Sequence, residues 1–286
     1  MSEKVLIVSD STSDLSPELI EKYGIKVLAL GVTIGDKTYS DGIDINPDVI
    51  YENYEKTGQL PKTAAINIAT FEDVFEEYTQ EGYSVVLFTI SSEMSSTYSN
   101  ARLAAEDYEN VFVVDTRNLS TGGGLLVLTA AEMAEAGKSA KEIADECTRL
   151  TDYVDASFVI DSLEFLHKGG RCSALAALGA NLLQLKPCIT VKGGKMGVNK
   201  KYRGKFATVL PQYIADRMGD ASDINIDKVF VTHAGCETSI IESCVAKVKE
   251  IAPDANVMIT RAGCTVSSHC GRNTLGVLFI RKAPLA

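Results

Sequence analysis

The sequence predicts an α/β protein with a mainly parallel N-terminal sheet and a C-terminal α+β domain. Short apolar runs alternate with helical patterns through the first half of the chain, which is typical of a sheet covered by helices on both faces. In the second half, two short runs are joined by Gly193-Gly194, which indicates a hairpin and antiparallel pairing. The length accommodates two domains, which we place at residues 1–155 and 156–286.

Strands and helices follow one another in the first half. Lys4–Ser9 is an apolar run that ends at Asp10, and Ser16-Pro17 supplies an N-cap and a first-turn proline for the helix that follows. Ligands bind beyond the carboxyl ends of parallel strands, so the segments after these strands are candidate sites. Further strands are expected at Ile25–Thr33, Ser84–Thr89 and Val111–Val114, and helices at Pro47–Thr57, Ala69–Glu81, Ser95–Glu109, Gly122–Ala136 and Ala140–Thr151.

The second half mixes the two patterns less regularly. Helices are expected at Ser173–Lys186, Thr208–Met218 and Thr238–Ile251. The first of these is apolar almost all round, so it lies in the core or borders an apolar cavity. Strands are expected at Ser157–Ile160, Pro187–Val191, Met196–Tyr202, Asp227–His233, Asn256–Arg261 and Gly276–Arg281.

The composition excludes several classes of function. A formal net charge of −10 disfavours binding to nucleic acid or to an anionic membrane surface. No apolar run is long enough for a membrane span, and the N-terminus is typical of a first strand rather than a signal peptide, so we expect a cytoplasmic protein. The run of lysines and arginines from Lys192 to Lys205 is either a solvated hairpin or a docking surface for an acidic or phosphate-handling partner.

The cysteines and histidines do not form a metal-site pattern. The seven cysteines include no CxxC pair, which indicates reduced thiols. His233 and Cys236 resemble half of a zinc site, but no second close pair accompanies them, so we predict no metal. We also predict no cofactor, because Gly122-Gly123-Gly124 is neither a dinucleotide fingerprint nor a phosphate-binding loop. These glycines instead favour close packing of a helix against a strand.

Two segments could bind an anion. The hydroxyl-rich loop Ser91–Thr97 joins a buried strand to a helix, where free backbone N–H groups also point outward. Simple helix capping by one serine is the alternative. Ser267–Asn273 places His269 in what we expect to be a polar loop, where it is either a ligand or a structural histidine. There is no GxSxG motif of a serine hydrolase.

Five segments, in this order, resemble the DegV family of bacterial fatty-acid-binding proteins over nearly the whole chain. They are Asp10-Ser11-Thr12-Ser13-Asp14-Leu15, Ser91-Ser92-x-Met94-Ser95-x-Thr97-Tyr98, Leu166-x-Lys168-Gly169-Gly170-Arg171, Leu185-Lys186-Pro187, and Ser268-His269-x-Gly271 before Leu275-Gly276-Val277.

The resemblance implies a binding function and not an enzyme. It implies that one long-chain fatty acid lies between the two domains, with its tail in an apolar tunnel and its carboxylate at Thr63, Ser95 and His269. Ser92 is the neighbouring candidate to Ser95, and Ser11 belongs to the same set of hydroxyls. Some members carry the lipid for a fatty-acid kinase, which phosphorylates the bound carboxylate, so a kinase and an acyltransferase are the expected protein partners. The alternative is an acyl hydrolase or transferase that uses Ser95 and His269.

Arg171 follows Lys168-Gly169-Gly170, where we expect a tight exposed turn. There it either pairs within its own domain, contacts the ligand, or takes an acidic group or phosphate of the partner kinase. The chain also departs from the family pattern in three places. Ala64-Ala65-Ile66 replaces Ser-Gln-Pro after Thr63, Ser96 replaces a glycine, and Gly271-Arg272-Asn273 replaces Gly-Pro-Gly.

Overall fold

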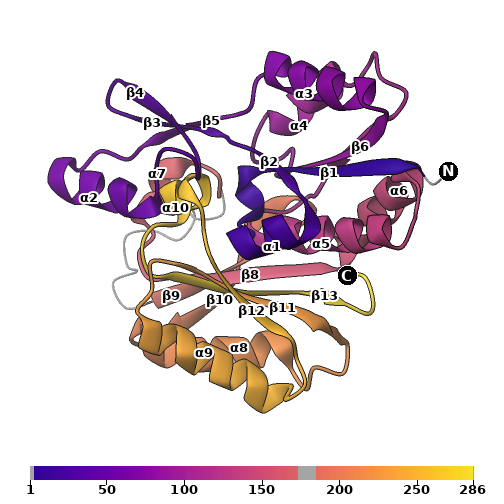
Figure 1. Cartoon of the computed structure of the whole chain (residues 1–286). Helices are drawn as coiled ribbons and strands as arrows, with labels where there is room; N and C mark the ends of the chain where they lie inside the picture. Colours follow the sequence, from indigo (N-terminus) through magenta and orange to yellow (C-terminus); the bar gives the residue numbers. More distant parts are fainter. Residues whose placement is uncertain (1–2, 173–184, 286) are drawn as a thin grey trace.

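The computed structural model describes residues 3–172 and 185–285, and Figure 1 shows an N-terminal and a C-terminal sheet stacked with helices between them. The N-terminal sheet has the strand order β2-β1-β6-β7 and is parallel throughout. Its strands are β1 (Lys4–Asp10), β2 (Lys26–Leu28), β6 (Tyr83–Thr89) and β7 (Val111–Asp115).

Helices cover both faces of this sheet. Successive residues of a strand point to opposite faces, so Ile7 and Val86 join one apolar cluster while Val8 and Leu87 join another. The second cluster includes Phe71 and packs under α3 (Ile68–Gln80) and α4 (Thr97–Ala104). The first packs against α1 (Pro17–Tyr23), α5 (Thr121–Glu135) and α6 (Ala140–Leu150), which is followed by the short turn η2 (Thr151–Tyr153).

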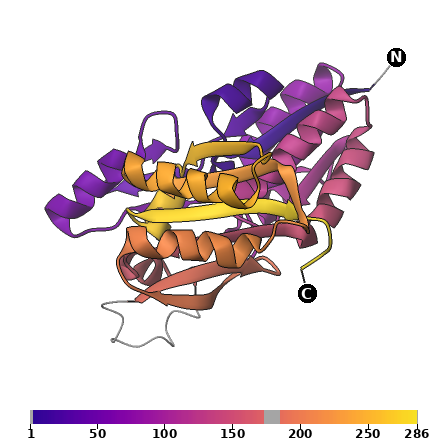
Figure 2. The ribbon, with the colours of Figure 1, turned by 90° about the horizontal axis from the view of Figure 1, so that it is seen from below.

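The C-terminal sheet has the order β10-β9-β8-β13-β11-β12, with β11–β12 as its one parallel pair. Helix α5 lies against its inner face, so the core is continuous from one sheet to the other, while α8 and α9 cover its outer face (Figures 1 and 2). The elements are β8 (Val154–Ile160), β9 (Leu185–Lys192), β10 (Lys195–Arg203), α8 (Phe206–Met218), β11 (Ile224–Ala234), α9 (Thr238–Ile251), β12 (Val257–Arg261) and β13 (Thr274–Arg281).

A third, small sheet lies beside the junction of the two domains. It has the order β4-β3-β5 and is antiparallel, with β3 (Gly31–Ile34), β4 (Lys37–Ser40) and β5 (Lys62–Ala64). Helix α10 (Cys264–Cys270), from the far end of the chain, packs against β3, β5 and the short turn η1 (Ser11–Ser13). It also contacts α2 (Pro47–Thr57) and α7 (Glu164–Gly169).

The predicted fold class is confirmed, and most predicted elements are present within a few residues. Two expectations are wrong. The predicted strand Ile25–Thr33 is split between β2 and β3, which belong to different sheets. Ser267–Asn273 is not a polar loop, because its first four residues complete α10. The predicted helix Ser173–Lys186 lies mostly outside the described residues, and the domain boundary at residue 155 stays a prediction. None of the helices in residues 3–172 and 185–285 is long and apolar enough to cross a membrane.

The glycines at the start of α5 allow two close approaches. Gly122 approaches Ala156 of β8, which is the helix–strand packing that the sequence predicts, and Gly124 approaches η1. A Cβ at Gly124 would lie 2.7 Å from the Ser13 carbonyl oxygen and 2.9 Å from Leu15 Cδ2. A Cβ at Gly123 would lie no closer than 3.4 Å to any atom, the nearest being Thr116 Oγ1. The two adjacent glycines therefore differ sharply in the space around them.

We expect Gly124→Ala to destabilise the protein by about 1–3 kcal/mol, because the new methyl group meets backbone rather than a flexible side chain. Gly123→Ala is the control in the same helical turn and should be neutral or stabilising by up to about 1 kcal/mol, because alanine has the higher helix propensity. Urea denaturation of both variants measures the difference. Equal free energies of unfolding for the two variants would contradict this account of the packing.

Candidate functional site

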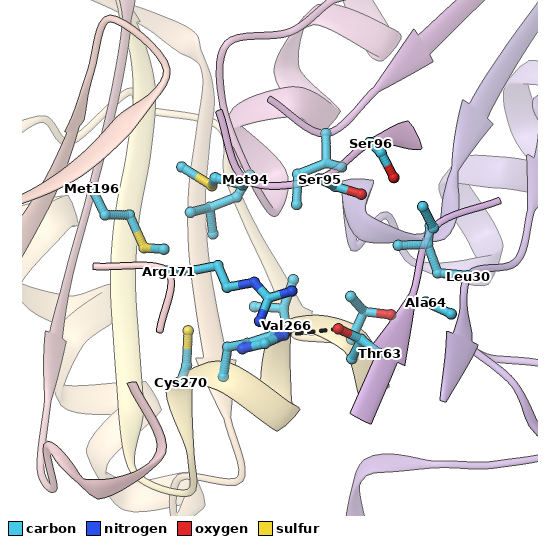
Figure 3. Close-up of a pocket in the computed structure, with 15 residues that line it drawn as sticks. Leu30, Thr63, Ala64, Met94, Ser95, Ser96, Arg171, Met196, Val266 and Cys270 are labelled. Atoms are coloured by element: carbon cyan, nitrogen blue, oxygen red, sulfur yellow. Dashed lines mark hydrogen bonds between the residues drawn. The ribbon is translucent and has the colours of Figure 1, made fainter. Parts of the chain in front are cut away.

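A cavity of about 190 Å³ lies between the two domains, near the carboxyl ends of β2 and β6, which are followed by the lining residues Leu30 and Ile90. It is bordered by the Ser-rich loop after β6, by β5, by α10 and by β10 (Figure 3). Residues far apart in the sequence therefore meet at one place. The lining residues are Leu30, Thr63, Ala64, Ala65, Ile90, Met94, Ser95, Ser96, Leu119, Arg171, Met196, Thr265, Val266, His269 and Cys270.

Helix α10 gives this cavity both a polar and an apolar wall. Residues four apart in a helix lie on the same face, so Thr265 and His269 form one stripe and Val266 and Cys270 form a second stripe beside it. All four residues line the cavity. Val266 and Cys270, together with Leu119, form an apolar wall of the cavity. The same three residues also border a second, mostly apolar space of about 30 Å³ beneath the C-terminal sheet.

His269 is hydrogen-bonded across the domain junction to Thr63, with 2.9 Å between Nε2 and Oγ1 (Figure 3). Burial, helped by the charge of Arg171, lowers the pKa of His269 to about 4, so the imidazole is neutral at pH 7. Nδ1 has no hydrogen-bond partner among the described residues and faces Gly169, where a Cβ would lie 2.5 Å away. A proton on Nε2 therefore suits this environment, since Nε2–H can donate to Thr63 and leave the threonine O–H free to donate elsewhere.

Ser95 and Ser96 supply hydroxyls from the opposite wall. Ser95 Oγ accepts from the backbone N–H of Thr97 and lies 2.9 Å from Thr97 Oγ1. Ser96 is the N-cap residue of α4, yet its side chain makes no capping hydrogen bond. His269 is bonded to Thr63 and Ser95 to Thr97, so the two residues of the hydrolase alternative are bonded to other partners here and not to each other.

Arg171 lies at the cavity with its side chain extending toward Thr63 (Figure 3), and its charge acts on His269. One guanidinium nitrogen donates to the carbonyl oxygen of Gly169, the last residue of α7, at 2.7 Å. This bond uses one of the five N–H donors of the guanidinium and leaves others available to a ligand. Among the described residues that line the cavity, Arg171 is the only arginine or lysine.

Two predicted site residues lie elsewhere. Ser92 is exposed, where its backbone N–H donates to Asp115 and its hydroxyl accepts from Arg117. Ser11 does not line the cavity, and its hydroxyl donates to Asp41 and accepts from the backbone N–H of Leu30. The structure thus brings together Thr63, Ser95, Arg171 and His269 but not these two serines.

The β9–β10 hairpin contacts the Ser-rich loop across the domain junction. Ser91 donates to the Gly194 carbonyl oxygen at 2.7 Å, and Arg117 donates to that of Gly193. Lys195 forms an ion pair of 3.3 Å with Glu93. These contacts hold the hairpin in place and so bring Met196 to the cavity wall.

Three aspartates are buried near the base of α10. Asp14 accepts from the Ser120 hydroxyl and, at 2.8 Å, from the backbone N–H of Gly263. Burial raises the pKa of Asp14 to about 8 and that of Asp10 to about 6. Asp41 accepts from two backbone N–H groups of α10. Among residues 3–172 and 185–285 there is no group of three or more histidine, cysteine or acidic side chains arranged to hold a metal ion.

Sequence reasoning missed Ser96, Thr265 and Asp41. Thr265 stands four residues before His269, a spacing that would have placed it on the same face had α10 been predicted. Asp41 carries no local signal, because its partners on α10 lie more than two hundred residues away in the chain.

Comparison with known proteins gives one consistent family. A family model described as an uncharacterised protein of the DegV family matches residues 4–282. A DegV domain-containing protein of Clostridium perfringens is 37% identical over 98% of this chain and 99% of its own length. One of Clostridium acetobutylicum is 34% identical over the same shares of the two chains.

Solved structures agree with this. A DegV family protein of Thermus thermophilus, described by its fatty acid binding, has a TM-score of 0.87 and 28% identity over 97% of this chain and 99% of its own. The fatty acid binding protein DegV of Bacillus subtilis has a TM-score of 0.85 and 26% identity over 98% and 100%. A stearic acid-binding protein of Eubacterium ventriosum has a TM-score of 0.79 and 29% identity over 96% and 98%.

The raised pKa of Asp14 predicts a specific dependence of stability on pH. The folded protein keeps a proton on Asp14 up to about pH 8, whereas the unfolded chain releases it near pH 4. The stability that the folded protein gains by keeping this proton is therefore fully present below pH 4 and is lost as the pH rises through 8. Asp14→Asn keeps the acceptor for Gly263 and removes the titration, so its stability relative to wild type should rise by up to about 1.4 kcal/mol per pH unit over that window.

Urea denaturation at pH 5, 7 and 9 measures this difference. A difference between Asp14→Asn and wild type that is the same at all three values would show that Asp14 does not carry the proton. Asp152→Asn, in the surface turn η2, is the control and should show no such trend.

Proposed function

This chain belongs to the DegV family, and we propose that it binds one long-chain fatty acid in the cavity between its two domains. The observation that carries the proposal is the composition of the cavity wall. Hydroxyls of Thr63 and Ser95, the neutral His269 and the cationic Arg171 gather at one part, and most of the other lining side chains are apolar. An apolar pocket with a few convergent polar groups suits an amphipathic ligand of this kind.

The polar groups suit an ionised carboxylate. A buried carboxylate without partners is very costly, and hydrogen bonds from donors offset that cost. With Nε2–H of His269 donating to Thr63, the Thr63 O–H is available to the ligand, and Ser95 offers a second hydroxyl. Arg171 adds a positive charge at the same place.

The apolar wall suits the acyl tail. Val266 and Cys270 on α10, with Leu119, separate the main cavity from the small apolar space beneath the C-terminal sheet. A tail that starts at the polar groups and follows this wall points toward that space. The fatty acids that the related structures are described as binding are of the class this path would take.

Protein expressed in bacteria should retain about one fatty acid per chain, detectable by mass spectrometry of an organic extract. Delipidated protein should regain thermal stability when a fatty acid is added, because a ligand that binds only the folded state stabilises it. Absence of lipid in the extract together with absence of stabilisation would refute the proposal.

Ser95→Ala and His269→Ala should each weaken fatty-acid binding by about 1.5–3 kcal/mol, because each removes a partner of a buried charged acceptor. Affinity for the fatty alcohol of the same length should change far less. Ser92→Ala is the matched control, since Ser92 lies in the same loop but outside the cavity. If acid and alcohol respond alike, these side chains do not hold the carboxylate.

We further propose that the protein is a carrier without catalytic activity of its own. A partner kinase would phosphorylate the bound carboxylate, and an acyltransferase would receive the acyl phosphate. The absence from the sequence of a phosphate-binding loop supports a separate ATP-binding partner.

Arg171→Ala should lower the affinity for fatty acid about tenfold, because it removes a charge-assisted hydrogen bond at the head group. Lys168→Ala, in the same segment but paired on the surface with Glu164, is the control and should bind normally. Isothermal titration with a fatty acid gives the affinities, and acyl-phosphate formation with kinase and ATP gives a second measurement. Normal affinity with slow phosphorylation would instead assign Arg171 to docking the kinase.

A further inference from the structure

Helix α10 has too few residues and too weak a cap to fix its own position. It is seven residues long, and its N-cap residue is Gly263, which has no side chain to accept from the first amide groups. An isolated helix of this length is unstable in water. Yet its last turn carries His269, whose Nε2 must lie within hydrogen-bond distance of Thr63 in the other domain.

Two carboxylates from the N-terminal domain take the free amide groups at the start of α10. Asp14 accepts from Gly263 N–H, and Asp41 accepts from Cys264 N–H at 2.7 Å through Oδ1 and from Thr265 N–H at 2.9 Å through Oδ2. Asp41 is 3% exposed. The N-terminal domain therefore holds α10 at its first turn through Asp41 and at its last turn through Thr63.

We propose that Asp41 is a positioning residue for the ligand head group, fixing α10 across the domain junction and thereby the place of His269 in the cavity. This inference rests on the proposed fatty-acid binding. Asp41 is not itself one of the residues that line the cavity. It acts through the helix that bears two residues of the polar wall, Thr265 and His269.

The surroundings of Asp41 are built for this contact. The Ser11 hydroxyl donates to Oδ2 at 3.2 Å and accepts from the backbone N–H of Leu30, which lines the cavity. The backbone N–H of Asp41 in turn donates to the Leu30 carbonyl oxygen. At Gly263 a Cβ would lie 3.1 Å from Asp14 Oδ1 and 3.3 Å from Asp41 Oδ1, so a glycine allows both carboxylates to reach the helix.

Asp41→Asn tests the proposal, because it preserves one acceptor and the shape of the side chain. Fatty-acid affinity should fall about tenfold, while the affinity for the fatty alcohol of equal length should fall no more than about twofold. Asp44→Asn is the control, since Asp44 lies in the same loop, is exposed and accepts only from the Ser40 N–H. In a His269→Ala background Asp41→Asn should change the acid-to-alcohol ratio no further, because the two residues act through one contact.

A second variant and a ligand-free measurement keep the test decisive. Gly263→Ala is the variant to use if Asp41→Asn does not fold. Its Cβ would press on both aspartate side chains without removing a hydrogen-bonding group, so the acid-to-alcohol affinity ratio should fall as in Asp41→Asn. In protein without lipid, NMR titration should show the pKa of His269 rising from about 4 in Asp41→Asn, as the imidazole is released toward water.

The outcomes separate this inference from the proposed function. A lower melting temperature with an unchanged acid-to-alcohol ratio and unchanged His269 titration would make Asp41 a purely structural residue and overturn the inference. If wild type binds no fatty acid but the His269 titration still moves in Asp41→Asn, the positioning role stands and the proposed ligand falls.

Discussion

The arrangement of the cavity depends on how the first amide groups of α10 are satisfied. Those groups are buried at the junction of two domains, and unpaired N–H groups there would cost free energy comparable to a lost hydrogen bond each. Asp14 and Asp41 accept from them, which joins the C-terminal helix to the N-terminal sheet. The polar wall contains Thr63 from one domain and His269 from the other, so the site exists only while this junction is intact.

Charge balance around the cavity follows from the same burial. Asp10, Asp14 and Asp41 lie close to a place proposed for a further carboxylate, and four negative charges there would repel one another strongly. Burial raises the pKa of Asp14 to about 8, so that group is protonated at neutral pH and the repulsion is reduced.

The sequence was sufficient to predict the fold class and part of the site because the necessary signals are local. Caps, apolar runs and the Gly193-Gly194 turn lie next to the elements that they define. The split between β2 and β3 and the helical state of α10 have no such signal. Helix α10 lacks a side-chain cap of its own, and its partner Asp41 is brought near only by folding. The same reason explains why Ser11, close in type and position to a ligand hydroxyl, instead bonds Asp41.

The basic hairpin has a consequence for association between copies of the chain. Among the strands in the described part of the chain, β10 is the outermost of the C-terminal sheet and pairs with β9 alone, on its inner side. Its outer edge would offer unpaired backbone groups to a second β10, the usual route to sheet-to-sheet aggregation. Lys195, Lys200, Lys201 and Arg203 along this strand put like charges against like charges in any such pairing. The basic residues of β10 therefore disfavour edge-to-edge pairing of this strand with the same strand of a second molecule.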